Sequence, residues 1–336
     1  MSAPRGPAAV LREPRPVEQA PLQIEEREAP SAGPGEVLLR VRACGVCRTD
    51  LHIAEGELQP RRSTIVPGHQ IVGDVVALGE GARASLGARV GVSWLGGVDG
   101  TCSHCRAGRE NLCDAPVFTG YDRDGGYAAY VTAQAGFSVP LPSALADEQA
   151  APLLCAGVIG FRALRVAGVE RGERVGLFGF GASAHLALPV LQAWNCEVYV
   201  STRGASHRAL ARELGAVWVG EAQEVPPQAL DRAITFAPAG DVVLAALRSL
   251  RKGGVVAINA IHLDRIPAFD YDTLLWGERQ LRSVANMTRA DARDFVALAA
   301  QIGLRPRVRS LPLEQANAAL ALLKNDRVDG AAVLIP

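Results

Sequence analysis

The chain has 336 residues, 49% of them apolar, and its 35 basic side chains balance 35 acidic ones. A neutral chain lacks the basic patch that binds nucleic acid or an anionic membrane, so we expect neither partner. The N-terminal stretch has no apolar core of a secretory signal, and no uninterrupted apolar run reaches about 18 residues. We therefore expect a cytoplasmic protein of about two domains.

The first 150 residues predict short strands joined by turns, because runs rich in β-branched residues alternate there with glycine and proline. These runs are EVLLRVRA, QIVGDVVALG, ARVGVSW and GGYAAYVTA. The pattern then changes to a strand, RVGLFGFG, a helix, ASAHLALPVLQAW, a second strand, EVYVST, and a second helix, SHRALARELGA. Strands that alternate with helices indicate βαβ units and a parallel sheet.

The same alternation continues through VWVG, RAITFAP, VVLAALRSLRKGG and VVAINA. The tail predicts two helices, ADARDFVALAAQ and LEQANAALALLKN, and a last strand, AAVLIP. We predict an α/β protein in which a nucleotide-binding domain with a doubly wound parallel sheet, residues 151–283, is inserted into a β-rich domain, residues 1–150 and 284–336.

A glycine-rich turn follows the first strand of the predicted parallel sheet. Gly179, Gly181 and Ala184 fit G-x-G-x-x-G/A, in which the first glycine permits a tight turn and the second lets backbone approach a pyrophosphate. The N–H groups of the following helix point at that anion. The turn therefore predicts a dinucleotide site, with further contacts from Phe180, Ala182 and Ser183.

The end of the second strand bears on the choice of cofactor. About 20 residues after the glycines, an acidic residue binds the ribose 2′-hydroxyl of NAD. This chain has Ser201, Thr202 and Arg203 there. An arginine with small hydroxyls suits a 2′-phosphate, which favours NADP over NAD. The alternative is that Arg203 only stacks on adenine or faces solvent.

Three residues far apart in the sequence are candidate ligands of a catalytic metal. Cys47, His69 and Cys155 would offer two thiolates and an imidazole and leave a fourth position open, as in a catalytic zinc site. Taken singly, Cys155 is also compatible with a buried core thiol, and His69 with a turn histidine. Clustered cysteines in a large chain favour metal ligands over disulfides.

The motifs GVCRTDLH, VPGHQIVG, GRENLC, APLLCAG and GFGASA resemble those of zinc-dependent alcohol dehydrogenases of the medium-chain dehydrogenase/reductase superfamily. The resemblance covers nearly the whole chain. It implies a GroES-like catalytic domain, a Rossmann domain and an active site in the cleft between them. It also implies interconversion of a primary or secondary alcohol with its aldehyde or ketone by hydride transfer to or from NAD(P), in a homodimer or homotetramer.

The resemblance assigns roles around the catalytic zinc. Thr49 would hydrogen-bond the substrate oxygen, and His52 would pass its proton to water. Asp50 would orient His69, and Arg48 would contact the pyrophosphate. The remaining cofactor contacts expected from the resemblance are Phe236, Asn259 and Val284.

The chain departs from the family pattern next to the ligand histidine. Gln70 stands where relatives have a glutamate that reaches zinc transiently, and glutamine still offers an oxygen as an alternate ligand. Ala331 stands where many relatives carry an arginine, with Arg327 nearby. Trp94 falls on the loop that lines the substrate pocket of relatives and would narrow it toward small primary alcohols and aldehydes. A core or interface tryptophan is the alternative for Trp94 and the preferred reading for Trp276.

Relatives hold a structural zinc with four cysteines spaced C-x2-C-x2-C-x7-C, whereas this chain has aspartate in the first place. We expect a second zinc, making two per chain, because a carboxylate is an accepted zinc ligand. His104 is a rival fourth ligand, and an empty site with free thiols is the remaining alternative. The expected ligands are Asp99, Cys102, Cys105 and Cys113.

Two other functions remain open at this stage. One is a related zinc dehydrogenase for polyols or cinnamyl-type alcohols. The other is a non-catalytic nucleotide sensor on the same fold, which should have lost a zinc ligand or the proton relay. The chain retains Cys47, His69, Cys155, Thr49 and His52, and this favours the enzyme.

Overall fold

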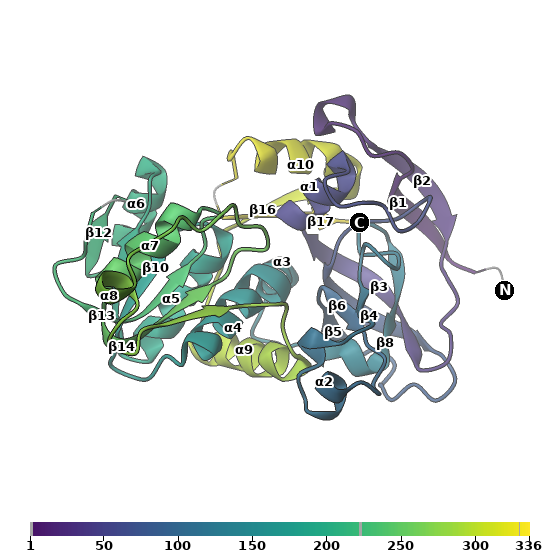
Figure 1. Cartoon of the computed structure of the whole chain (residues 1–336). Coiled ribbons are helices and arrows are strands. Elements are labelled where there is room, and N and C mark those ends of the chain that lie inside the picture. The colour runs from purple at the N-terminus through teal and green to yellow at the C-terminus, as the bar shows by residue number, and fades with distance from the viewer. Residues whose placement is uncertain (1–2, 222–223, 329) are drawn as a thin grey trace. The chain divides into compact units, whose positions relative to one another are not determined.

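The computed structural model describes residues 3–221, 224–328 and 330–336. The chain divides into two compact units (Figure 1), Met1–Cys155 with Asn286–Pro336 and Ala156–Ala285. Each unit has its own sheets and its own hydrophobic cluster. The first is rich in antiparallel strands and the second contains a parallel sheet, so the predicted fold class is confirmed.

A seven-stranded sheet forms the centre of the first unit. Its strands run in the order β16-β17-β3-β4-β5-β9, and β8 also pairs with β3. Most neighbours are antiparallel, and β16 and β17 are parallel. The strands are β3 (Glu36–Gly45), β4 (Gln70–Leu78), β5 (Arg89–Val92), β8 (Tyr130–Gln134), β9 (Ser138–Pro140), β16 (Val308–Pro312) and β17 (Ala331–Ile335).

The N-terminal residues form two strands that sequence analysis did not predict. β1 (Arg5–Leu11) pairs antiparallel with β2 (Leu22–Glu28). The last four residues of β1 are buried, and Ala9 N–H donates to Tyr127 O at 2.8 Å. Proline and charged residues dominate the composition of this stretch, and composition alone does not indicate the two strands that pair with each other here.

A close backbone contact replaces the first half of a predicted strand. The stretch GGYAAYVTA becomes strand only from Tyr130, and the N–H groups of its first three residues bond the segment that leads to His69. Gly125 N–H donates to Val66 O at 2.7 Å. A Cβ atom at Gly125 would lie 2.0 Å from Gly68 O, so only glycine permits this approach. The contact supports the backbone that presents His69.

The helices of the first unit include the two predicted in the C-terminal tail. The second of these, α10, packs against α1 and β17. α9 begins with a capping box in which Thr288 and Asp291 bond reciprocally. The helices are α1 (Arg48–Glu55), α2 (Ser103–Arg106), α3 (Asp147–Pro152), α9 (Arg289–Gln301) and α10 (Ala316–Lys324). Short strands β6 (Leu95–Gly97) and β7 (Val117–Phe118) pair beside them.

The second unit is a six-stranded parallel sheet with the order β12-β11-β10-β13-β14-β15. This is the strand order of a doubly wound dinucleotide-binding sheet. Its strands are β10 (Arg174–Phe178), β11 (Glu197–Ser201), β12 (Trp218–Gly220), β13 (Leu230–Thr235), β14 (Leu250–Ile258) and β15 (Gln280–Ser283). Its helices are α4 (Val158–Ala167), α5 (Ala182–Ala193), α6 (Ala205–Glu213), α7 (Gly240–Ser249) and α8 (Tyr271–Leu274).

One continuous helical stretch, Asp147–Ala167, is long and apolar enough to cross a membrane by length and composition alone. Of its most apolar window, 67% is buried inside the protein. A helix in the core of a protein is apolar on most of its surface, as a membrane-spanning helix is. Burial of this extent inside the protein is typical of a core helix.

Candidate active site and metal centres

Three segments of the first unit bring Cys47, His69 and Cys155 together. Cys47 is the N-cap residue of α1, His69 immediately precedes β4, and Cys155 lies between α3 and α4. Their ligand atoms all lie within 4.8 Å of one another, and the two sulfurs are 4.0 Å apart. A tetrahedral zinc with bonds of about 2.3 Å separates two sulfurs by about 3.8 Å, so the sulfur spacing fits zinc.

The start of α1 prepares Cys47 as a thiolate ligand. Its side chain and that of Asp50 form a capping box at the helix N-terminus. The hydrogen bond from the Cys155 thiol outweighs burial and, with His69, holds the pKa of Cys47 well below its usual range. The pKa of Cys155 is raised well above its usual range by its bond to Cys47 and by burial. One sulfur of the pair therefore ionises readily, and a cation would favour ionisation of both.

Asp50 hydrogen-bonds one ring nitrogen of His69 and so determines which nitrogen is available to bind a metal. Its carboxylate lies 3.0 Å from His69 Nδ1, and both residues are fully buried. Burial alone would lower the pKa of His69, but Asp50 and the Cys47 sulfur raise it to about 10. Nε2 is buried, and no atom in the described ranges hydrogen-bonds it. A buried nitrogen with no such partner, facing two sulfurs, is what a metal ligand requires.

The carboxylate of Asp50 accepts three further hydrogen bonds. They come from Cys47 N at 2.9 Å, Gly68 N at 3.2 Å and Tyr127 Oη at 3.1 Å. Tyr127 is fully buried, and sequence analysis did not identify it. The pKa of its phenol is raised well above the usual range by burial and by the Asp50 charge, so it stays a donor. All three bonds fix the orientation of the carboxylate that holds His69.

A wide helical turn presents Cys155. Residues Leu153–Gly157 form a π-helix between α3 and α4. Such turns insert an extra residue into a helix and occur frequently at functional sites. Leu153 and Leu154 are buried, and Leu154 packs against Gly91 of β5. Cys155 is therefore held in place by the sheet that also carries His69.

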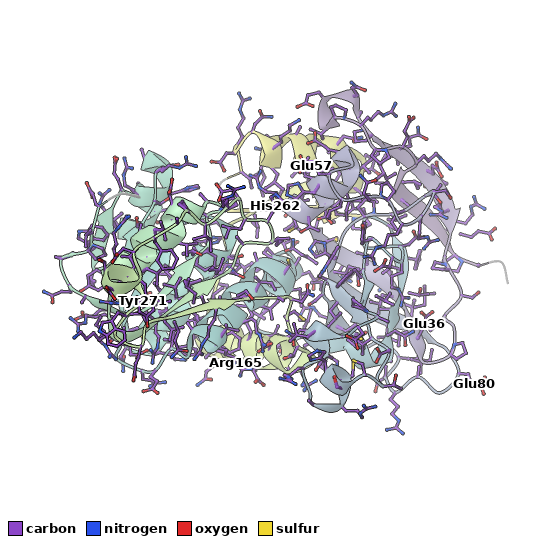
Figure 2. The ribbon with its side chains drawn as sticks, in the orientation of Figure 1. Glu36, Glu57, Glu80, Arg165, His262 and Tyr271 are labelled. Atoms are coloured by element: carbon purple, nitrogen blue, oxygen red, sulfur yellow. The ribbon has the colours of Figure 1, made fainter. Side chains whose placement is uncertain are left out.

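The other residues expected near the catalytic zinc occupy different environments. Thr49 is buried, and its hydroxyl lies 3.7 Å from Cys47 Sγ. Arg48 is exposed at the start of α1. His52, one turn further on, is half-buried, and its Nδ1 hydrogen-bonds Glu57, which is labelled in Figure 2. Gln70 is buried, and its amide packs over Gly45, its partner in the β3–β4 ladder.

Aromatic rings form a wall beside His69. The Trp94 ring meets the His69 ring edge-on at 5.1 Å. Trp94 stacks on Phe118 at 4.8 Å and on Tyr121 at 5.9 Å. The guanidinium of Arg61 lies 4.9 Å from the centre of the Tyr121 ring. Sequence analysis named Trp94 alone, because the other three residues reach it only through the fold.

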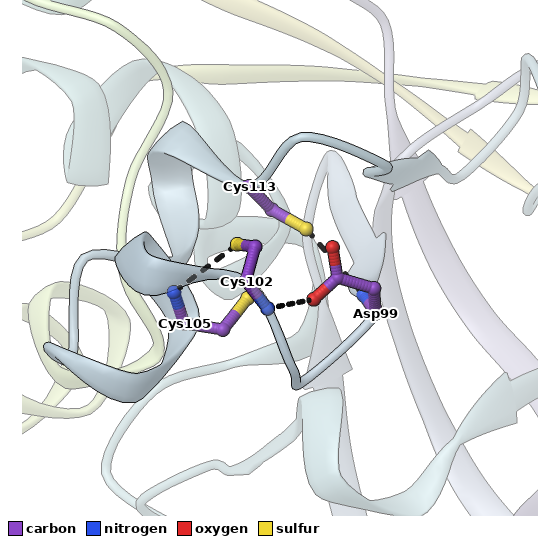
Figure 3. A group of neighbouring side chains, drawn as sticks. All are labelled: Asp99, Cys102, Cys105 and Cys113. Atoms are coloured by element: carbon purple, nitrogen blue, oxygen red, sulfur yellow. Dashed lines mark hydrogen bonds between the residues drawn. The ribbon is translucent and has the colours of Figure 1, made fainter.

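The four residues of the second metal motif also converge. Ligand atoms of Asp99, Cys102, Cys105 and Cys113 lie within 4.8 Å of one another, and Figure 3 shows the Asp99 carboxylate directed at the sulfurs. His104 lies outside this group, although no described atom hydrogen-bonds its buried Nδ1. Three sulfurs and a carboxylate form a donor set suited to tetrahedral zinc.

Backbone N–H groups support the charges of this second site. Asp99 Oδ1 accepts from Thr101 N at 2.6 Å and Cys102 N at 2.9 Å. The N–H groups of Cys102 and Thr101 lower the pKa of Asp99. Cys113 Sγ accepts from Asp99 N at 3.4 Å. Desolvation and the neighbouring sulfurs raise the pKa of Cys105 to about 12, so the four groups cannot all ionise easily without a cation.

The glycine-rich turn of the second unit has the shape of an anion cradle. Gly179 has φ +91°, and a Cβ there would lie 3.0 Å from Ala237 N. A Cβ at Gly181 would meet no atom within 4 Å, so the space above it is open. Gly181 is the N-cap of α5, whose first N–H groups have no side-chain cap. These groups can accept a phosphate.

The remaining cofactor candidates of this unit lie where strands of the parallel sheet end. Phe236 follows β13, Asn259 follows β14, and Val284 follows β15. Carboxyl ends of strands in a doubly wound sheet are where dinucleotides bind. Phe180 and Ala184 are buried, whereas Ala182 is exposed and Ser183 is half-buried.

The end of β11 exposes one basic side chain. Arg203 is exposed, whereas Ser201 and Thr202 are buried. The Ser201 hydroxyl donates to Glu221 O at 3.0 Å, so this donor is already used. No described residue hydrogen-bonds or pairs with the Arg203 guanidinium. Arg208 of α6, which sequence analysis did not identify, contacts the turn with NH1 2.7 Å from Arg203 O.

Comparisons with known proteins extend over both units. Residues 33–143 match the alcohol dehydrogenase GroES-like domain family. The chain is 46% identical over 331 residues to the probable alcohol dehydrogenase AdhA of Mycobacterium tuberculosis, covering 97% of this chain and 96% of that protein. It is 34% identical over 324 residues to an alcohol dehydrogenase of Geobacillus stearothermophilus, covering 94% and 96%.

Among solved structures, the crystal structure of AibC has a TM-score of 0.91 and 26% sequence identity to this chain. The match covers 99% of this chain and 96% of that one. The similarity in fold therefore extends over both units of this chain.

Proposed function

Since this chain belongs to the zinc-dependent alcohol dehydrogenases of the medium-chain dehydrogenase/reductase superfamily, we propose which of its residues bind zinc, substrate and cofactor and which transfer the proton. The chain is an oxidoreductase that interconverts alcohols and carbonyl compounds. We assign the catalytic zinc to Cys47, His69 and Cys155. The observation that carries this assignment is the buried Nε2 of His69, which lacks a described hydrogen-bond partner and faces two sulfurs.

Three protein ligands would leave one position of a tetrahedral zinc for the substrate. A zinc ion there would supply a Lewis acid that lowers the pKa of an alcohol and polarises a carbonyl group. Asp50, by accepting from His69 Nδ1, keeps the proton on that nitrogen, so Nε2 is the nitrogen that would lose its proton and coordinate zinc. The bonds from Cys47 N and Tyr127 to Asp50 make this arrangement rigid before any ligand binds.

Thr49 and His52 are the residues that we propose handle the proton. Thr49 is buried beside Cys47, and its hydroxyl would hydrogen-bond the substrate oxygen. His52 is half-buried and bonded to exposed Glu57, so it would exchange the proton with water. Water can replace part of this function, and we expect His52 to be helpful rather than essential.

The second unit would bind the nicotinamide cofactor, with NADP preferred. The nicotinamide supplies the hydride acceptor or donor. Gly179, Gly181 and the free N-terminus of α5 would hold the pyrophosphate. Exposed Arg203 would bind the 2′-phosphate, since its charge is not neutralised by any described acid. Further contacts would come from Arg48, Phe180, Ala182, Ser183, Ala184, Ser201, Thr202, Phe236, Asn259 and Val284.

We propose a second, structural zinc held by Asp99, Cys102, Cys105 and Cys113. The spacing of the four ligand atoms and the N–H groups aimed at Asp99 and the sulfurs support it. Four protein ligands leave no open position, which is typical of structural zinc. Its role would be to hold a lobe whose own helices, α2 and the 3-10 turn Glu110–Leu112, are each a single turn.

The aromatic wall favours small primary alcohols and aldehydes as substrates. Trp94 lies edge-on to His69 and is backed by Phe118 and Tyr121. A stacked wall resists displacement by a bulky substituent, because moving Trp94 would break both stacking contacts. Polyols and cinnamyl-type alcohols remain the alternative substrate class.

One experiment tests the assignment and the cofactor together. Zinc analysis of purified protein should find two zincs per chain, and oxidation of NADPH should exceed that of NADH with a panel of short aldehydes. Cys47→Ser and Cys155→Ser should each remove one zinc and abolish turnover. Full activity of either variant would contradict the zinc assignment, and equal kcat/KM for the two cofactors would contradict the NADP preference.

A further inference from the structure

The turn after β11 is held from three directions. Ser201 Oγ donates to Glu221 O at 3.0 Å, and Thr202 N–H donates to Gly220 O at 3.1 Å. The third contact comes from α6, where Arg208 reaches back over the turn. These bonds fix the backbone of residues 201–203, which ends in the exposed side chain of Arg203.

Arg208 uses one nitrogen for three acceptors. Its NH1 lies 2.7 Å from Arg203 O, 3.3 Å from Thr202 O and 3.2 Å from the carboxylate of Glu221. The Arg208 side chain is 20% exposed. The carbonyl groups of the turn would otherwise lose bonding partners at the end of a strand, and a charged donor to them is stronger than a neutral one.

The two arginines therefore differ in what they can offer a ligand. Arg208 donates from NH1 to two backbone carbonyl groups, and Glu221 balances its charge. Arg203 has neither kind of partner among the residues that the structure describes. A phosphate that approached this turn would meet one uncompensated guanidinium, that of Arg203, on a backbone that is held by the NH1 group of Arg208.

We propose that Arg208 is a positioning residue for recognition of the 2′-phosphate of the cofactor. It acts through the carbonyl groups of Thr202 and Arg203, which set the direction in which the Arg203 side chain leaves the backbone. The proposal rests on the proposed preference for NADP. It predicts that Arg208 affects ligands that carry a 2′-phosphate and leaves the same ligand without that phosphate nearly unaffected.

Adenosine 2′,5′-bisphosphate and AMP are suitable probes, because they differ only in the 2′-phosphate and can be titrated by calorimetry without turnover. In Arg208→Gln we expect affinity for the bisphosphate to fall about 10-fold, while affinity for AMP changes less than about 2-fold. Arg208→Lys should restore most of the loss, because an ammonium group can occupy the place of the single nitrogen NH1.

Arg212→Gln is the matched control. Arg212 lies one turn further along α6, and no described side-chain contact joins it to the turn. The Arg212→Gln substitution removes the same charge from the same helix and should leave the affinities for the bisphosphate and for AMP unchanged. A bisphosphate loss in Arg212→Gln equal to that in Arg208→Gln would assign the effect to long-range charge and overturn the proposal.

The remaining outcomes separate the two proposals. The positioning role is overturned if Arg208→Gln keeps wild-type affinity for the bisphosphate, or if it lowers the affinity for AMP by the same factor. The role is also overturned if Arg208→Lys loses as much selectivity for the bisphosphate over AMP as Arg208→Gln does. Wild-type protein that binds both probes equally, with Arg203→Gln unchanged, would instead overturn the proposed preference for NADP.

Discussion

Replacing Asp50 with asparagine tests the hydrogen bonds behind His69. Asp50 accepts four of them, two on each carboxylate oxygen. Asparagine keeps one acceptor oxygen and presents an NH2 group in place of the other. Whichever way the amide is turned, its NH2 group faces a backbone N–H, either that of Gly68 or that of Cys47. One buried donor therefore loses its acceptor in both orientations.

The size of the effect follows from this count. A buried donor without an acceptor costs about 1–3 kcal/mol. Mutation of the hydrogen-bonding partner of a metal-binding histidine typically costs about 10–100-fold in metal affinity or activity. For Asp50→Asn we expect zinc affinity at the catalytic site to fall by about 10–100-fold. We also expect the zinc-free protein to lose about 1–3 kcal/mol of unfolding free energy.

Competition with a chromophoric chelator measures the zinc affinity, with Cys47→Ser protein as the blank for the second site. Urea denaturation of zinc-free protein measures the stability. Tyr127→Phe is the matched control, because it removes one of the four bonds and keeps the carboxylate. It should cost about 0.5–1.5 kcal/mol and leave zinc affinity within about 3-fold. Asp50→Asn protein that keeps zinc affinity within about 2-fold of wild type would refute the reasoning.

Three further predictions concern separate parts of the chain. Asp99→Ala should lower the zinc content from two to one per chain, whereas His104→Ala should leave it unchanged; the reverse result would make His104 the fourth ligand. His52→Ala should reduce kcat less than Cys47→Ser, measured with one aldehyde at saturating cofactor, since water can take over part of the proton transfer. Burial would raise the pKa of Asp231, but Arg251 outweighs it and lowers that pKa, so Asp231 should stabilise the protein above about pH 4 and less as pH falls further. Urea denaturation of Asp231→Asn should show a loss of about 0.5–1 kcal/mol at pH 7 that becomes smaller as the pH is lowered toward 3; an equal loss at both pH values would contradict the ion-pair explanation.

The parallel sheet was predictable from the sequence because its signals are local. The strand that became β10, the glycines after it and the helix that became α5 stand in consecutive residues. The first strand at the N-terminus, β1, was not predictable, because its burial depends on partners such as Tyr127, more than 100 residues away. Composition describes a segment by itself and cannot report such a contact.

The same distinction applies to the site. The resemblance to a family identified the candidate metal ligands, because they stand in short recognisable motifs. Tyr127, Glu57 and Arg208 stand in no such motif. They matter only through the atom that each one reaches, Asp50 Oδ2, His52 Nδ1 or the carbonyl of Arg203. Residues that act through other residues are found from geometry, and sequence periodicity does not contain that geometry.

The close contact between the segment before His69 and the loop before β8 has a consequence for mutational tolerance. A Cβ atom at Gly125 would lie 2.0 Å from Gly68 O, and one at Gly68 would lie 2.4 Å from the Tyr127 ring. Neither glycine carries a side chain that could bind zinc or move a proton. A survey of all single substitutions scored by activity would nevertheless rank these two positions beside Cys47 and His69, because any side chain there displaces the backbone that presents the imidazole. At this site, a position that tolerates no substitution can therefore lack space for a side chain and have no chemical role of its own.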